Sequence, residues 1–588
     1  MPSSRKDIDM ALDFVTGSIR RSEHRGDDDL LSAGLGLAGV AGLPVRFADP
    51  AQPTAAELRR RAIQTGWKGI ADLGPLGGFG RLYGAVPDVP GREYSAFARF
   101  AQARHPHRVL CQVPDAFDAR ARCLVVAPSS GSRGIYGAMA LAGGWALPRG
   151  CAVVYTDKGT GSGYFDCASG TGVALDGTRV AAGSAMLEFE PAETHADAGI
   201  AVKHAHSGDH PEADWGAHVL QAVEFGLAML DEAFPEQAPF TPANTRIIAV
   251  GISNGGAAVL QAAGVDRDGW LDGVVAIEPN VQAPVRGRAL YDYASEAALW
   301  MPAALTAARF AGIPFTRAAG LPPPAWAARR GNLHERGLLP SGEPAAAAEA
   351  ARDYLHASGW CDEALATAAT SVAFDLWRAV AVTYSSAYLR AGVGAMPCGF
   401  AFRPVEVPAV PAPVVRAAWW ADGSGIPPDV GIGVFGGLEA STDPTLPGVL
   451  ALRELWDGDA DAAATLRAAV AKLDAGLPRE GLPIWIVHGA EDGLIPTAFS
   501  SDIYVDWLRE QGREPRYWRV PHAQHFDAFL QLPAFGDRYV PLLPYGYVAL
   551  DRMYAHVVQA APLADLPTPQ PRPRGARALE LDNLDLPR

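Results

Sequence analysis

The fold is decided by residues 245–250, TRIIAV, which run directly into Gly251-Ile252-Ser253-Asn254-Gly255-Gly256 and then into AAVLQAAG. The apolar run predicts a buried strand, and the Ala-rich run after it predicts a helix over 254–264. The order G-x-S-x-G between them is typical of a nucleophile elbow, a turn too tight for side chains at its flanks. Such a turn raises the Ser253 hydroxyl above the sheet edge and directs the Asn254 N–H at the reacting centre. We therefore expect Ser253 to be a nucleophile and Asn254 an oxyanion donor, the alternative being a Gly/Ser turn without chemistry.

Around this stretch, short apolar runs alternate with amphipathic ones. Nearly continuous apolar strands separated by helices predict a parallel sheet with helices on both faces. Thr497 is a plausible N-cap for the last of the long helices, and Gly512 a plausible stop. The predicted strands are 122–130, 151–157, 271–278, 483–488 and 516–520, and the predicted helices are 136–147, 215–234 and 497–512.

The alternation stops after residue 289 and returns near residue 478. The segment between is Ala-rich, with helices expected at 344–356 and 363–389. An insertion of this size is ordinary for a domain, so we predict an α/β-hydrolase fold with a large, mainly helical cap. The expected division is an N-terminal extension with early strands packing on the core (1–104), the first part of the core (105–289), the cap (290–477), the second part of the core (478–560) and an extended or disordered Pro-rich tail (561–588).

A serine nucleophile needs a base and an acid, which follow it along the chain in this fold. The strand PIWIVH leads into GAEDGLIP, where Asp492 has the better position for the acid and Glu491 is the alternative. The strand RYWRV leads into PHAQHFDAF, where His525 is the expected base and His522 the competitor.

Two loops after earlier strands are expected beside this group. The loop SSGSRG after the strand RCLVVAP can supply a second oxyanion N–H, from Ser129 or Ser130. The loop DKGTGSG lacks the G-x-x-x-x-G-K-[ST] order of a phosphate loop, so we expect Asp157 and Lys158 to line the same cleft. In HAHSGDH, residues 204–210, a metal site is the less favoured interpretation, and we expect His206 in a polar loop near the cleft.

The composition excludes several classes of partner. Fifty Lys and Arg against 65 Asp and Glu leave a net charge of −15, which argues against nucleic acid and anionic membranes. Six separated cysteines with no C-x-x-C pair exclude a disulfide miniprotein and a Cys-rich zinc module, and no cofactor or metal is expected. The polar N-terminus predicts no signal peptide, as in a cytoplasmic protein or the mature form of an exported one.

Beyond the elbow, several segments share a pattern with one known family. They are DDDLLSAGLGLAGVAG (27–42), VVAPSSGSRGIYGAM (125–139), YTDKGTGSGYFD (155–166), VKHAHSGDHPEADWG (202–216) and VGISNGGAAVLQA (250–262), and the similarity continues through IWIVHGAEDGLIP and AQHFDAF. In these segments the chain resembles the D-(−)-3-hydroxybutyrate oligomer hydrolases. The resemblance implies hydrolysis of 3-hydroxybutyrate dimers and short oligomers to the monomer, with the family's nucleophilic serine at Ser253. The alternatives are an esterase for feruloyl, tannate-like or polyester-fragment esters, and a non-catalytic binding scaffold.

The predicted cap emerges at the carboxyl edge of the sheet, the edge that carries the elbow, so we expect it to roof Ser253. A roofed, apolar cleft favours short soluble esters over a polymer surface. The tryptophans expected either in its lining or in the cap core are Trp300, Trp326, Trp360, Trp377, Trp419 and Trp420.

Overall fold

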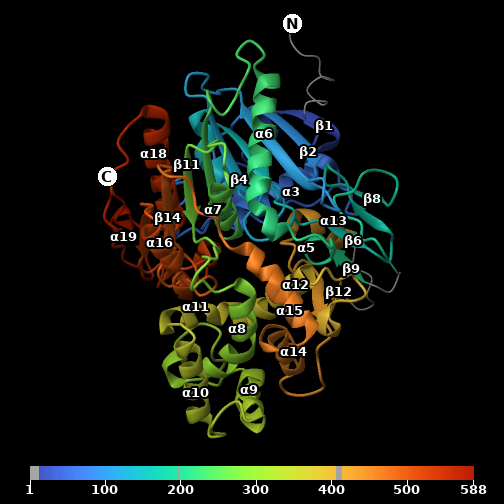
Figure 1. The fold of residues 1–588 in the computed structure, drawn as a ribbon, viewed down its shortest axis with the longest axis vertical. Helices are drawn as coiled ribbons and strands as arrows, with labels where there is room; N and C mark the ends of the chain where they lie inside the picture. Colours follow the sequence, from blue (N-terminus) through green and yellow to red (C-terminus); the bar gives the residue numbers. More distant parts are fainter. Residues whose placement is uncertain (1–11, 195–198, 406–412, 588) are drawn as a thin grey trace.

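The fold centres on one nine-stranded sheet, seen in Figure 1 in a computed structural model that describes residues 12–194, 199–405 and 413–587. The strand order is β1-β2-β3-β5-β4-β10-β11-β14-β15. The strands are β1 (Val15–His24), β2 (Gly91–Ala98), β3 (His107–Pro114), β4 (Cys123–Pro128), β5 (Ala152–Thr156), β10 (Arg246–Ile252), β11 (Gly273–Ile277), β14 (Ile484–Gly489) and β15 (Arg516–Val520).

The sheet is mixed rather than wholly parallel. The strands expected from the sequence, from β5 to β15, pair in parallel. The first three strands pair antiparallel and extend the same sheet beyond β5. Residue 104, the expected end of an N-terminal extension, therefore lies between two neighbouring strands of the main sheet.

Both faces of the sheet are covered by helices, as the apolar strands predict. Alternate residues of β10 enter different cores, because successive side chains in a strand point to opposite faces. Ile247 and Ala249 pack with α6 (Trp215–Ala233), α7 (Asn254–Val265) and α16 (Ser501–Glu510). Ile248 and Val250 pack on the other face with α3 (Ala55–Lys68) and α18 (Leu543–Gln559). Fully burying an Ile or Val side chain contributes about 1.5–3 kcal/mol. The packing of both faces of β10 therefore holds in place the strand that carries the elbow.

The helices of residues 290–477 gather mostly below the sheet in Figure 1. The predicted single helix over 363–389 is wrong, because Asp375 adopts φ +58° and the chain bends by 76° between two helices. Two short strands, β12 (Ala401–Pro404) and β13 (Ile432–Phe435), pair in the same interval. The helices are α8 (Leu290–Ala304), α9 (Pro324–Glu335), α10 (Pro344–Ala357), α11 (Asp362–Ala373), α12 (Leu376–Tyr388), α13 (Pro413–Asp422), α14 (Leu446–Asp457) and α15 (Asp461–Val470).

Three further segments differ from the sequence-based expectation. The expected loop after β5 contains a four-stranded sheet of short strands, β6 (Tyr164–Asp166), β7 (Thr171–Val173), β8 (Arg179–Ala181) and β9 (Ile200–Val202). Thr497 is not the N-cap of α16, because a separate 3-10 turn occupies Thr497–Phe499, whereas Gly512 does follow the helix with φ +70°. The tail is mostly extended but ends in a short helix, α19 (Leu581–Leu584), and it packs on the domain through buried Leu579 and Leu584.

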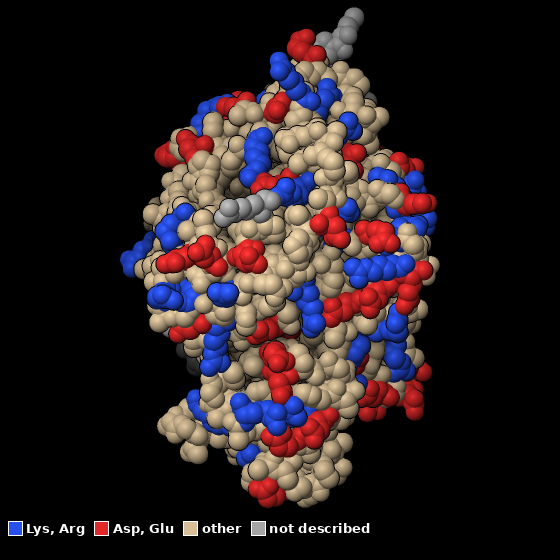
Figure 2. Space-filling model, turned by 90° about the vertical axis from the view of Figure 1, so that its left-hand side faces the viewer, with Lys and Arg blue, Asp and Glu red and all other residues tan. Residues whose placement is uncertain are grey.

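Two observations concern the charge of the surface and the length of the apolar helices. On the face in Figure 2, acidic and basic side chains are interspersed, without an extended basic patch. In the described ranges, no single helix is long and apolar enough to cross a bilayer; α11 and α12 meet that test only as a pair, across their bend.

Candidate active site

The elbow after β10 holds Ser253 in a strained backbone conformation, with φ +58° and ψ −123°. A non-glycine residue in such a region costs on the order of 1–3 kcal/mol, which the surrounding packing must supply. A Cβ at Gly251 would lie 2.1 Å from the Gly255 carbonyl oxygen, and one at Gly255 would lie 2.7 Å from that of Pro128. The glycines at both flanks are therefore required by close backbone contact.

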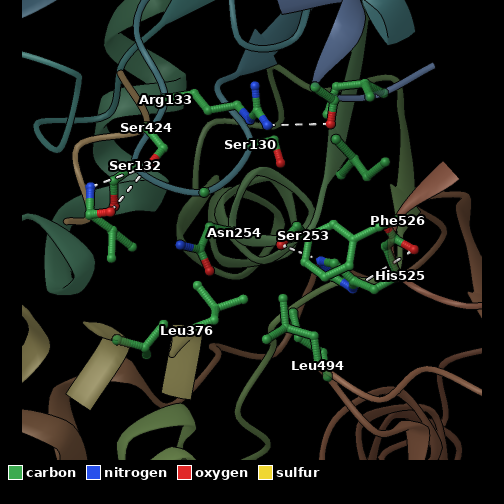
Figure 3. Close-up of a pocket in the computed structure, with 18 of the residues that line it drawn as sticks. Ser130, Ser132, Arg133, Ser253, Asn254, Leu376, Ser424, Leu494, His525 and Phe526 are labelled. Atoms are coloured by element: carbon green, nitrogen blue, oxygen red, sulfur yellow. Dashed lines mark hydrogen bonds and ion pairs between the residues drawn. The ribbon is translucent and has the colours of Figure 1, made fainter. Parts of the chain in front are cut away.

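Ser253, His525 and Asp492 form a continuous hydrogen-bonded chain. The Ser253 Oγ lies 3.1 Å from His525 Nε2, and His525 Nδ1 lies 2.7 Å from Asp492 Oδ2. Figure 3 shows the His525 ring turned toward Ser253. Asp492 follows β14 and His525 follows β15, so three loops at one sheet edge bring them together. A base in contact with an alcohol, oriented by an acid, is an arrangement that activates a nucleophile.

Asp492 is a fixed, ionised partner for His525. Its other oxygen, Oδ1, accepts the backbone N–H groups of Leu494 (2.8 Å) and Ile495 (2.7 Å). Burial works to raise the pKa of Asp492, but His525 and His488 outweigh it and hold that pKa well below its usual range. His488 Nε2 lies 3.1 Å from Asp492 Oδ2. The sequence analysis did not identify His488 as a site residue, and the one signal for it was its position four residues before the acid.

The two alternatives considered from the sequence pair with each other instead. Glu491 Oε1 lies 3.3 Å from His522 Nδ1, and the His522 side chain is 45% exposed. Neither makes a hydrogen bond to Ser253 or His525 in the described part of the chain. The structure thus brings together the favoured residues, Asp492 and His525, and not these two.

Glu278 is a buried carboxyl beside His525 that the sequence did not reveal. It directly follows β11 and has φ +38°, and its Oε2 lies 3.9 Å from His525 Nδ1 without a hydrogen-bond partner among the described residues. Burial, with the nearby charges of Asp492 and Asp527, raises the pKa of Glu278 well above its usual value. The raised pKa favours the neutral form of Glu278, which carries no charge to compete with Asp492 for His525. Its only sequence signal was its position at the end of a strand.

Two backbone N–H groups near Ser253 are available to an oxyanion. Asn254 is the first residue of α7, so its N–H has no acceptor within the helix. The Ser129 N–H donates to the Thr156 carbonyl at 2.9 Å, which excludes Ser129 as the second backbone donor and corrects that half of the expectation. The Ser130 N–H has no acceptor in the described part of the chain, and Ser130 lines the Ser253 pocket.

Asn254 is also held by its side chain. Its Nδ2 donates to the Tyr384 hydroxyl at 2.8 Å, and its Oδ1 accepts from Asn280 Nδ2 at 2.9 Å. Tyr384 belongs to α12, so a helix of the predicted cap is tied directly to the residue after the nucleophile.

Asp157, Lys158 and His206 are not in the lining of the Ser253 pocket, contrary to the expectation. Lys158 instead contacts the loop that carries Ser129 and Ser130, because its Nζ donates to Ser129 Oγ at 3.0 Å. Burial lowers the pKa of Lys158 to about 7, although Asp157 and Glu212 oppose that shift. Asp157 accepts from Lys203 Nζ at 3.1 Å. His206 accepts the Val202 N–H at 2.9 Å, and its burial lowers its pKa to about 3.

The other histidines of the run 204–210 belong to a buried chain of hydrogen bonds that starts at Ser132, on the same loop as Ser129 and Ser130. Ser132 Oγ lies 2.6 Å from His204 Nδ1, and His204 Nε2 contacts Glu212. Glu212 also lies 3.2 Å from His210 Nδ1. In the described residues, the one cluster with metal-ligand spacing is Glu278, Asp492 and His525, which is the site just described.

The pocket above Ser253 contains about 920 Å³ of space outside protein atoms, its open mouth included. Leu376, Val380 and Tyr384 of α12 line it together with Ile426 and Leu494, so most of the wall is apolar. Of the two places expected for the six tryptophans, the structure shows the core: all six are at most 8% exposed, and none lines this pocket.

Comparison with known proteins gives one consistent result. A family model described as 3HB-oligomer hydrolase matches residues 4–585. A protein of Paracidovorax citrulli named D-(−)-3-hydroxybutyrate oligomer hydrolase is 38% identical, over 95% of this chain and 89% of its own. A protein of the same name from Cupriavidus metallidurans is 36% identical, over 96% and 87%.

The solved structures that the comparison finds are much more distant in sequence. Feruloyl esterase B from Aspergillus oryzae is 12% identical, covers 88% of each chain and has a TM-score of 0.32. The rice cell wall degrading esterase LipA from Xanthomonas oryzae is 10% identical, over 80% of this chain and 91% of its own, with a TM-score of 0.35.

Proposed function

Because the chain belongs to the 3HB-oligomer hydrolase family and is therefore a carboxylic-ester hydrolase, we propose that it cleaves 3-hydroxybutyrate dimers and short oligomers to the monomer. The observation that carries this proposal is the Ser253–His525–Asp492 chain at the floor of a mostly apolar pocket. The apolar wall of the pocket suits the methyl and methylene groups of a short oligoester.

The reaction begins with attack by Ser253 on the ester carbonyl carbon. His525 Nε2 takes the Ser253 proton, and Asp492 holds the imidazole and stabilises its charged form. The negative charge on the carbonyl oxygen is met by the N–H groups of Asn254 and Ser130. The C–O bond then breaks, and His525 returns the proton to the departing alcohol oxygen.

The acyl group left on Ser253 is a 3-hydroxybutyryl ester. A water molecule loses a proton to His525 and attacks this ester, and the tetrahedral species collapses to release the acid and restore the Ser253 hydroxyl. Each cycle consumes one water and separates one ester into an acid and an alcohol. Residues 290–477 act here as a cap, since α12 supplies the pocket wall opposite Ser130 (Figure 3).

A panel of esters tests the substrate class. The purified protein is given the 3-hydroxybutyrate dimer, methyl ferulate, a galloyl ester and p-nitrophenyl butyrate, with the Ser253→Ala variant as control. The proposal expects the dimer to have the highest kcat/KM and the variant to lose turnover of every ester. A preference for the aromatic esters would favour a feruloyl or tannate-like esterase, and no turnover of any ester would indicate a binding scaffold.

A further inference from the structure

The Ser253 pocket contains one fixed cation. Arg133 is the one Lys or Arg side chain among the described residues that line it. It lies on the loop after β4 that also carries Ser130, and Figure 3 shows both on the same side of the pocket, opposite Leu376. The cation therefore belongs to the same short loop as a proposed oxyanion donor.

Arg133 has no counter-ion within ion-pair distance among the described residues. The one hydrogen bond of its guanidinium to a described residue is from Nη2 to the Gly69 carbonyl oxygen at 3.3 Å. Burial lowers the pKa of Arg133, and Asp429 is the one charge that opposes this. A guanidinium has five N–H donors, so most of those on Arg133 have no protein acceptor.

Buried arginines such as Arg59 and Arg329 are paired with carboxylates, whereas Arg133 is only partly buried. Arg59 Nη2 lies 2.8 Å from Glu93 Oε1, and Arg329 Nη2 lies 2.8 Å from Asp443 Oδ1. A buried charge without a partner is costly, so the pairing of these two is the expected condition. Arg133 differs from them in facing the pocket.

The guanidinium is also held in place by packing. A Cβ at Gly69 would lie 1.8 Å from Arg133 Nη1 and 2.2 Å from Cζ. The guanidinium therefore packs against the Gly69 backbone, in space that any side chain at residue 69 would occupy. An arginine fixed in this way loses little further freedom when it binds a planar anion through two parallel hydrogen bonds.

We propose that Arg133 binds the free carboxylate at the acid end of a short oligoester and so selects substrates whose chain end lies close to the scissile bond. This inference rests on the proposed function. A 3-hydroxybutyrate dimer carries a carboxylate only a few atoms from its single ester, so one pocket can hold both groups. Most esters of a long polymer have no such neighbour, and a neutral ester of the same shape forfeits this contact.

The test compares the dimer as its free acid with its methyl ester, at pH 7.5 and fixed ionic strength. The readout is the ratio of kcat/KM for acid over methyl ester, which a general loss of activity does not change. We expect Arg133→Met to lower this ratio by about 10- to 100-fold. Arg133→Lys, which keeps the charge but not the two-pronged geometry, is expected between that value and wild type. Arg336→Met, at an exposed position outside the pocket, is the matched control and keeps the wild-type ratio.

A binding measurement covers the case in which Arg133→Met folds poorly. In the Ser253→Ala background, which cannot turn over substrate, calorimetry is expected to show weaker binding of the acid dimer for Arg133→Lys than for Arg133. An unchanged ratio in Arg133→Met, or equal affinities in the binding experiment, would overturn the inference while leaving the proposed function intact. A wild-type protein that cleaves p-nitrophenyl butyrate but neither dimer would instead overturn the proposed function, and the inference with it.

Discussion

At the scale of single residues, Asp527 shows how closely the site is tied to the stability of the domain. It lies two residues after His525, is buried, and accepts the backbone N–H groups of Leu542 and Leu543 at the start of α18. Burial raises the pKa of Asp527 to about 7 from its ordinary value of 3.8, and the N–H groups of Leu543 and Leu542 only partly oppose this. The folded protein therefore keeps a proton that the unfolded chain gives up.

Replacing Asp527 by Asn tests this electrostatic account. Since the folded-state pKa is raised, wild-type stability from this group is full below about pH 4 and is lost as pH rises through about 7. The Asn variant lacks this loss, so its free energy of unfolding relative to wild type should increase by a few kcal/mol between pH 4 and pH 8. Urea unfolding at several pH values measures it, with exposed Asp506→Asn as control. Parallel pH profiles for wild type and Asp527→Asn would refute it.

The principal site residues could be predicted from the sequence because each follows a recognisable strand in a fixed order. Ser253 has a motif that requires glycines on both sides, and Asp492 and His525 follow it in the order that this fold imposes. Glu278 and His488 could not be found in the same way, since neither lies in a motif. Their proximity to His525 and Asp492 depends on which strands are neighbours in the sheet. Ser129 was mistaken for a donor because hydrogen bonding to β5 is invisible in the sequence.

At the scale of elements, α12 connects the predicted cap to the chemistry. Leu376 and Val380 line the pocket, and Tyr384, on the same helix, binds the Asn254 side chain. The helix can reach this position because the chain turns sharply at Asp375, whose carboxylate accepts from Arg378 Nε at 2.9 Å. An Ala-rich run gives no sign of such a turn, which explains why one long helix was expected there.

Tyr384→Phe is expected to lower kcat about 10-fold. The change removes the acceptor of Asn254 Nδ2 and leaves a buried amide unpaired, which costs about 1–3 kcal/mol and loosens the residue whose N–H faces the oxyanion. Steady-state kinetics on the dimer measure it. Tyr388→Phe, one turn later on the same helix and also buried, is the matched control and should change kcat little. Equal effects of the two substitutions would show that Asn254 is not positioned through Tyr384.

At the scale of the whole molecule, the site lies between a sheet edge and helices that come from a distant part of the chain. The Ser253 pocket is walled by α12 as well as by the loops of the sheet. The size and position of the insertion predicted that residues 290–477 lie over Ser253, and of this interval α12 does line the pocket. The sequence did not predict which side chains face the pocket, because Trp residues and Leu residues are equally suited to a core and only the packing decides between them.

A walled pocket has a consequence for polymer substrates. Chains in a solid film cannot enter it, whereas a dissolved trimer can, so the rate per enzyme molecule on a polyhydroxybutyrate film should be at least about 100-fold below that on trimer. Monomer release from both substrates, followed by chromatography under the same conditions, measures the difference. Comparable initial rates would show that residues 290–477 do not restrict access.

The most direct test of the whole account is monomer release from the 3-hydroxybutyrate dimer by wild type and by Ser253→Ala. The wild type is expected to convert each dimer to two monomers. The variant is expected to keep its circular dichroism spectrum and melting temperature but to lose about four to six powers of ten in kcat. A correctly folded Ser253→Ala protein that still released monomer at a substantial fraction of the wild-type rate would contradict it, because the nucleophile would then lie elsewhere.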